Sequence, residues 1–153
     1  MRFRLRTLST ILAGGLLLSA SIARAGGPAP RTEIEVKDAW VRWVPANLPS
    51  AGYMTLRNTG SVTEVLIGGT SADYQSVHLH QTAHEEGIMS MRAVKSLEIK
   101  PQESVRFARL GYHLMLMQPT RPLHAGDHVK IRLQFEQSAS IDVDFVVREE
   151  PAT

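Results

Sequence analysis

Residues 112–117 read Tyr-His-Leu-Met-Leu-Met (YHLMLM), an alternation of leucines with an imidazole and two thioethers. Successive side chains of a β-strand point to opposite faces of the sheet, so this spacing predicts a strand. The two leucines would lie on one face, which is typical of a core-facing side. His113, Met115 and Met117 would share the other face, where hydrocarbon packing does not explain the imidazole. The stretch therefore predicts a half-buried strand with an unusual outer face.

The rest of the chain also consists of short β-like runs between turn formers. No segment has a sustained 3.6-residue period, and Gly, Pro, Asn and Asp cluster between the runs. The candidate strands are 33–44, 51–58, 63–69, 75–82, 88–94, 104–107, 112–118, 128–135 and 141–148. Short strands at this spacing predict an all-β fold, either an antiparallel β-sandwich or a Greek-key barrel.

The N-terminus has the features of a secretory signal peptide. Three arginines precede an apolar run of roughly 13 residues, and the segment ends in Ala23-Arg24-Ala25. A membrane-spanning helix needs about 20 apolar residues, so an uncleaved anchor is the weaker alternative. We therefore expect export, cleavage after Ala25 and no membrane anchor. We assign 1–25 to the signal peptide, 26–32 to a flexible N-terminal segment, 33–148 to one β-domain and 149–153 to a disordered tail.

Charge and composition exclude several functions. The leader holds four of the 17 basic residues, so the remaining chain has 13 basic against 15 acidic residues, a net charge of −2. That balance gives no reason to expect nucleic-acid binding. There is no Cys nucleophile, no His/Glu metalloprotease motif and no Gly-x-Ser-x-Gly motif, so we expect no enzyme activity.

The sequence contains no cysteine. The domain therefore has to fold without disulfides, and the cysteine that a lipoprotein carries after its leader is missing. Blue-copper electron-transfer sites use a Cys thiolate, so that function is excluded. Any soft-metal ligand in this chain has to be a methionine.

Histidine and methionine gather in two parts of the chain. Four of the six methionines are residues 89, 91, 115 and 117, and three of the six histidines are residues 78, 80 and 84. Residues 76–94 read as two β-arms around a turn, which predicts a hairpin. A four-residue turn would pair Ala83 with Ile88 and set His80 opposite Met91, with Cβ atoms about 5 Å apart. A three-residue turn would instead set His80 opposite Arg92.

Four residues form the candidate metal site, in the pattern His80-x10-Met91-x21-His113-x-Met115. Two imidazoles and two thioethers suit a soft monovalent ion, above all Cu(I), whereas zinc sites use Cys, His and carboxylates. The alternative is that the methionines only fill gaps in the core. His124 and His128 are interpreted as surface residues.

These residues resemble the PCuAC (DUF461) family of periplasmic copper chaperones, whose hallmark is His-x10-Met-x21-His-x-Met. The similarity extends to the flanking text AGYMTLRNTG, EEGIMSMRAV, GYHLMLM and RPLHAGDHVKIRLQF, and covers roughly residues 34–147. The resemblance implies a cupredoxin-like β-sandwich that binds one Cu(I) per chain. It assigns the ligand role to His80, Met91, His113 and Met115 only. His78, His84, Met89 and Met117 lie outside the motif and are candidates for accessory, alternative or entry ligands, with no role assigned to any of them.

The resemblance also implies a function. A periplasmic protein of this kind would deliver copper by ligand exchange to the CuA-bearing subunit of cytochrome c oxidase, with Sco-type thiol proteins on the same route. We expect a monomer. Two alternatives stay open at this point: a periplasmic copper storage or resistance protein, and an exported β-sandwich that serves only as an interaction module, with the methionine face as its contact patch.

Overall fold

The computed structural model describes residues 33–45, 48–85 and 87–149. These residues form strands and no helix, as predicted, so none of them forms a helix that could cross a membrane. The strands are β1 (Ile34–Arg42), β2 (Ser50–Asn58), β3 (Glu64–Ser71), β4 (Tyr74–Glu85), β5 (Ile88–Ala93), β6 (Leu97–Ile99), β7 (Ser104–Arg106), β8 (Tyr112–Pro119), β9 (His128–Phe135) and β10 (Ile141–Arg148). The predicted signal peptide, the N-terminal segment and residues 150–153 of the tail lie outside the described residues.

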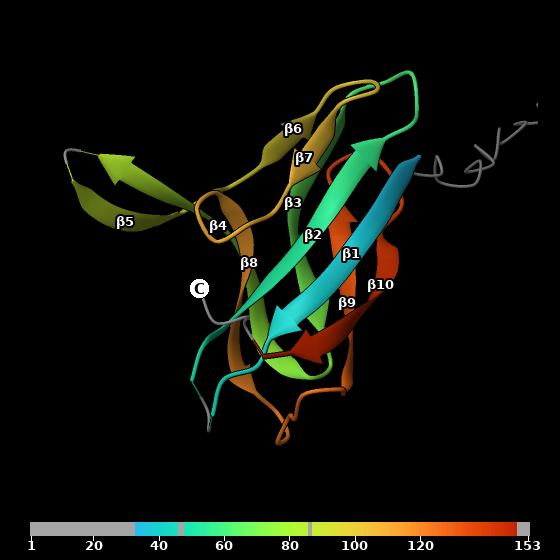
Figure 1. The fold of residues 1–153 in the computed structure, drawn as a ribbon. Coiled ribbons are helices and arrows are strands. Elements are labelled where there is room, and N and C mark those ends of the chain that lie inside the picture. Colours follow the sequence, from blue (N-terminus) through green and yellow to red (C-terminus); the bar gives the residue numbers. More distant parts are fainter. Residues whose placement is uncertain (1–32, 46–47, 86, 150–153) are drawn as a thin grey trace, which may run out of the picture.

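Seven strands close into a barrel (Figure 1). The hydrogen-bonded order is β4-β8-β2-β1-β10-β9-β3, and β3 returns to β4 through the pair Gly69–Val77. Strands β1 and β10 run parallel, and the other pairs are antiparallel. Closure leaves no free sheet edge around the barrel, because each of the seven strands has two partners. The predicted all-β barrel is thus confirmed.

The barrel interior is the hydrophobic core. In β9 the burial alternates along the strand, with Val129, Ile131 and Leu133 fully buried between exposed polar neighbours. In β8 the predicted core residues Leu114 and Leu116 are likewise fully buried. Burying one such side chain stabilises the fold by about 1.5–3 kcal/mol. The alternation in the sequence therefore predicted correctly which face of β8 points inward.

Two strand predictions needed correction. The short strand β6 was missed, because a three-residue strand between lysines carries too little alternation to stand out. Strand β4 was predicted to end at residue 82 but continues to Glu85. It pairs there with Ile88, so the hairpin turn spans two residues instead of the four from His84 to Gly87. Gly87 has φ +81, which glycine adopts without strain and which two-residue hairpin turns require.

The predicted cross-strand partner of Met91 is therefore also wrong. Met91 lies opposite Thr82 and not opposite His80. The difference is two residues, and an even shift of register returns every side chain to its original face. Met91 stays on the face that carries His80, as a diagonal neighbour instead of a direct partner.

The end of β4 and the whole of β5 project from the barrel as a two-stranded arm (Figure 1). Strand β4 pairs with β8 as far as Gln81–Tyr112, and the amide of Thr82 donates the last bond, 3.0 Å long, to the carbonyl of Gly111. Beyond that point β4 has only β5 as a partner, and every residue of β5 is exposed. Few buried contacts hold the arm, so we expect it to move more than the barrel.

Candidate metal centre

The predicted site residues lie on one face of the sheet, at the base of the arm. His80 of β4 is directly opposite His113 of β8, and the centroids of the two rings are 5.9 Å apart. His78 is directly opposite Met115 in the same pair of strands. Opposite residues on neighbouring strands point to the same side. The backbone therefore gathers three imidazoles and a thioether on one surface.

His113 is the anchored member of this group. Its side chain is only 4% exposed, and its Nδ1 lies 3.2 Å from the carbonyl oxygen of Gly111. A carbonyl oxygen only accepts, so this contact assigns the proton to Nδ1. Nε2 then keeps its lone pair, which is the arrangement that metal-binding histidines share. The loop before β8 thus orients His113 as a donor.

His80 has a buried ring nitrogen, Nδ1, that makes no hydrogen bond with the described residues. Burial lowers the pKa of His80 below the ordinary histidine value, and the neighbouring His113 and His78 lower the pKa further. A metal ligand has to be unprotonated, so this environment favours the binding form. The unpartnered nitrogen also fits a ring that holds a metal ion.

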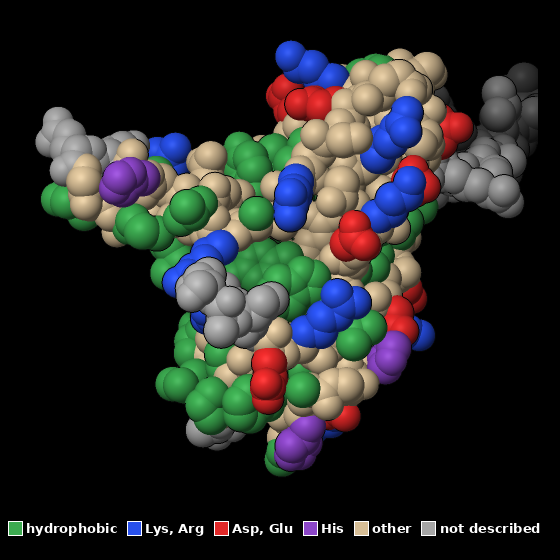
Figure 2. Space-filling model, viewed as in Figure 1, with side chains coloured by type: hydrophobic (Ala, Val, Ile, Leu, Met, Phe, Trp, Pro, Cys, Tyr) green, Lys and Arg blue, Asp and Glu red, His purple; other side chains and the backbone are tan. Residues whose placement is uncertain are grey.

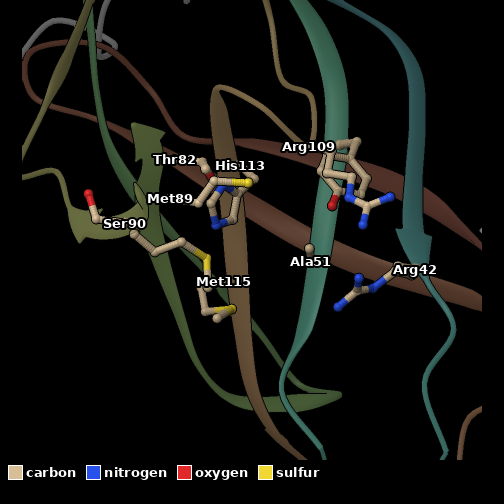
Figure 3. A pocket seen from close by; sticks show the side chains of 10 residues that line it. Arg42, Ala51, Thr82, Met89, Ser90, Arg109, His113 and Met115 are labelled. Carbon is tan, nitrogen blue, oxygen red and sulfur yellow. The ribbon is translucent and has the colours of Figure 1, made fainter. Parts of the chain in front are cut away.

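A pocket of about 240 Å³ lies between the arm and the barrel. Figure 2 shows the arm standing out from the barrel, with hydrophobic side chains and a histidine on its visible face. Met91, His113 and Met115 line the pocket, together with Met89, and Figure 3 shows Met89, His113 and Met115 on one side of it. His80 does not line the pocket but adjoins it through His113. Met91 is 61% exposed, so a thioether stands at the mouth of the pocket where an incoming ligand can reach it.

The opposite wall of the pocket carries positive charge. Arg42 and Arg109 line it, and Figure 3 shows both side chains on the other side of Ala51 from Met89 and Met115. Sequence reasoning missed both arginines, because they come from β1 and from the segment before β8 and share no motif.

The four unassigned residues have distinct positions. His78 is exposed, with its ring centroid 6.4 Å from that of His80. Met117 is half-buried opposite Ser76, beyond Met115. His84 and Met89 lie opposite each other on the arm. The described residues contain no group of three His, Cys, Asp or Glu that could hold a metal ion.

The remaining histidines agree with their interpretation as surface residues. His124 is 76% exposed, with Nδ1 3.9 Å from a carboxylate oxygen of Asp127. His128 is 61% exposed and its Nδ1 is 2.7 Å from a carboxylate oxygen of Asp144. Both lie in or beside the loop before β9, away from the residues of the pocket.

Comparison with known structures gives the same fold. The chain is similar to the Cu(I)-bound solution structure of DR1885 from Deinococcus radiodurans, with 31% identity, a TM-score of 0.62, and 83% of this chain and 85% of that chain covered. It also matches the copper-bound PCuAC domain of PmoF2, with 22% identity, a TM-score of 0.66, and 78% and 96% coverage. These neighbours have a cupredoxin-like β fold, so the predicted fold class is confirmed.

Comparison of sequences identifies the family. A putative lipoprotein, Lxx21020 of Leifsonia xyli subsp. xyli, is 30% identical over 151 residues, which are 95% of this chain and 89% of that protein. The family model described as putative lipoprotein LpqE-like matches residues 34–147, nearly the whole described domain. The resemblance to PCuAC domains found in the sequence is thereby confirmed. This chain belongs to the LpqE-like family, which is of the PCuAC type.

Proposed function

We propose that this protein is a copper chaperone that binds one Cu(I) through His80, Met91, His113 and Met115. The observation that carries the proposal is the shared face at the base of the arm, where His113, Met115 and Met91 line one pocket and His80 adjoins it. Neutral imidazoles and thioethers suit Cu(I), and thioethers are poor ligands for hard ions. The structural relatives whose names state that they are copper-bound support the choice of metal.

Transfer proceeds by ligand exchange. Met91 is the most exposed of the four donors and stands on the arm, whereas His113 is buried in the barrel wall. An acceptor ligand therefore displaces Met91 first, and the copper leaves the two histidines and Met115 afterwards. One copper–ligand bond forms for each bond that breaks, and the ion stays Cu(I) throughout. The protein acts as a carrier and not as an enzyme.

The proposal also covers the cellular location of the protein and the acceptor of its copper. The leader predicts an exported protein, and the relatives named as putative lipoproteins support export. In the periplasm the copper would go to the CuA-bearing subunit of cytochrome c oxidase, alongside Sco-type thiol proteins. Thiolates bind Cu(I) more strongly than thioethers do, which gives the transfer its direction.

A competition titration tests the metal site. The chain without residues 1–25 is titrated with Cu(I) against a chromophoric chelator, and Met91→Ala and Met115→Ala are compared with it. We expect one tightly bound Cu(I) per chain and at least about tenfold weaker binding in both variants. Ile88→Ala, also on β5 and 70% exposed, is the matched control and should keep the affinity. Unchanged affinity in both methionine variants would refute the ligand assignment.

A second experiment separates delivery from storage. The Cu(I)-loaded chain is mixed with an apo CuA domain, and the appearance of the CuA absorption is followed. A chaperone metallates the domain faster than the same concentration of chelator-buffered Cu(I). Equal rates would favour copper storage, and failure to bind copper at all would leave the interaction-module alternative.

A further inference from the structure

The arm carries two copper donors that the proposed site does not use. His84 and Met89 are directly opposite each other on β4 and β5. Met91 is two residues along β5 from Met89 and so points to the same face. This face continues without a break into the one that holds His80. One imidazole and one thioether therefore precede the proposed site along the arm, next to Met91 of that site.

Packing does not explain these side chains. Met89 is 57% exposed and Met91 is 61% exposed, although a methionine that fills a core would be buried. His84 is exposed as well. Exposed thioethers lose the benefit of apolar burial, so another role has to account for their grouping.

The pocket connects the two groups of donors. Met89 lines it together with Met91, His113 and Met115. Figure 3 shows Met89 on the same side of the pocket as His113. A copper ion that moves from the outer part of the arm to His113 thus meets thioethers along the way.

We propose that His84, Met89 and Met91 form a second, outer Cu(I) site, called here the hairpin site, which loads the inner site. The inference rests on the proposed function, because the copper it collects is the copper that the inner site holds. Opposite residues in an antiparallel pair have Cβ atoms about 5 Å apart, which allows an imidazole and a thioether to hold one ion between them. Met91 belongs to both sites.

Because Met91 belongs to both sites, Cu(I) moves from the hairpin site to the inner site in steps. Cu(I) first binds His84 and Met89, and an imidazolium at His84 would release its proton to water on binding. Met91 joins as the third ligand. His113 and Met115 then replace His84 and Met89, and His80 completes the inner set. Each new copper–ligand bond replaces an earlier one, and no electron is transferred.

Uptake kinetics with conservative variants test the hairpin site. Met89→Leu removes the thioether but keeps the apolar volume, and His84→Gln removes the imidazole but keeps a polar side chain. The control is Ile88→Ala, which lies on the same arm but on its other face. Cu(I) supplied as its complex with a chromophoric chelator is mixed rapidly with each chain, and the loss of the absorption of the chelator complex is followed.

We expect both arm variants to load at least about tenfold more slowly than wild type. They should still bind one Cu(I) at equilibrium, and Ile88→Ala should load at the wild-type rate. A second readout uses the methionine methyl resonances. In the double variant His113→Ala/Met115→Ala, the methyl signals of Met89 and Met91 should shift on addition of one equivalent of Cu(I).

Each outcome decides the inference. Wild-type loading rates in both arm variants, or unshifted Met89 signals in the double variant, would overturn it while leaving the inner site intact. Slow loading in Ile88→Ala as well would mean that arm conformation and not ligation sets the rate, which also overturns it. If wild type binds no Cu(I), the proposed function itself fails, which is a distinguishable result.

Discussion

His80 and His113 are opposite each other, but their Nδ1 atoms have different surroundings. His113 is buried and held through Nδ1 by the Gly111 carbonyl, whereas the buried Nδ1 of His80 has no partner among the described residues. An unpartnered buried polar atom costs about 1–3 kcal/mol. The metal-free protein thus carries a destabilising feature at the position where copper would bind.

The pH dependence of stability should expose this feature. The folded chain lowers the pKa of His80, so below about pH 6.5 the unfolded chain binds more protons than the folded chain. The free energy of unfolding of the metal-free protein should therefore fall as the pH drops through about 6.5 and level off below the lowered pKa. Urea unfolding at a series of pH values measures this, and His80→Gln should reduce the fall. An identical pH profile in the variant would contradict the prediction.

A substitution at Met115 can test metal binding and core packing separately. Met115→Leu keeps the apolar volume, so it should change the free energy of unfolding by less than about 1.5 kcal/mol. Leucine has no donor atom, and the affinity for Cu(I) should fall at least about tenfold. Thermal unfolding and the competition titration give the two quantities on the same sample. Unchanged affinity would show that Met115 only packs.

At the scale of elements, the arm differs from the barrel strands. Strand β5 has one neighbouring strand and no buried residue, whereas β8 lies between β4 and β2 with Leu114 and Leu116 in the core. The last bond to the barrel on β4 is at Thr82, and on the returning chain Val94 donates to Leu79 over 2.8 Å. Between these two bonds the arm is supported mainly by its own pairing.

Copper binding should stiffen the arm. A ligand on β5 and three on the barrel strands would tie the arm to β8, so backbone amides of residues 83–85 and 88–91 should exchange more slowly when Cu(I) is bound. Hydrogen exchange measured with and without Cu(I) tests this. The amides of β9, far from the site, serve as the internal control. Equal exchange on the arm in both states would exclude Met91 as a ligand that bridges arm and barrel.

At the scale of the molecule, the barrel core and the arm should contribute separately to the free energy of unfolding. Phe145 of β10 is fully buried, and a Cβ atom added at Gly52 of β2 would lie 3.7 Å from its ring. Phe145→Ala should lower the free energy of unfolding by about 3–5 kcal/mol. Ile88→Ala on the arm should change it by less than about 0.5 kcal/mol. Urea unfolding of both variants measures the contrast, and equal losses would mean that the arm is part of the cooperative core.

The sequence by itself determined the fold class and the core-facing residues of β8. Alternation has a period of two, so the faces of β8 could be predicted residue by residue, and His113 and Met115 had to share a face. The absence of cysteine left methionine as the soft ligand. The motif spacing supplied the family, which the comparisons confirmed.

Only the tertiary structure decided the rest. The hairpin register depends on a turn two residues shorter than predicted, which local sequence specifies weakly. The opposition of His80 and His113, and of His78 and Met115, follows from the pairing of β4 with β8, which are separated in sequence by β5, β6 and β7. The arginine wall comes from segments distant in sequence. Alternation fixes which way a side chain points, but only closure of the barrel fixes which other side chains it meets.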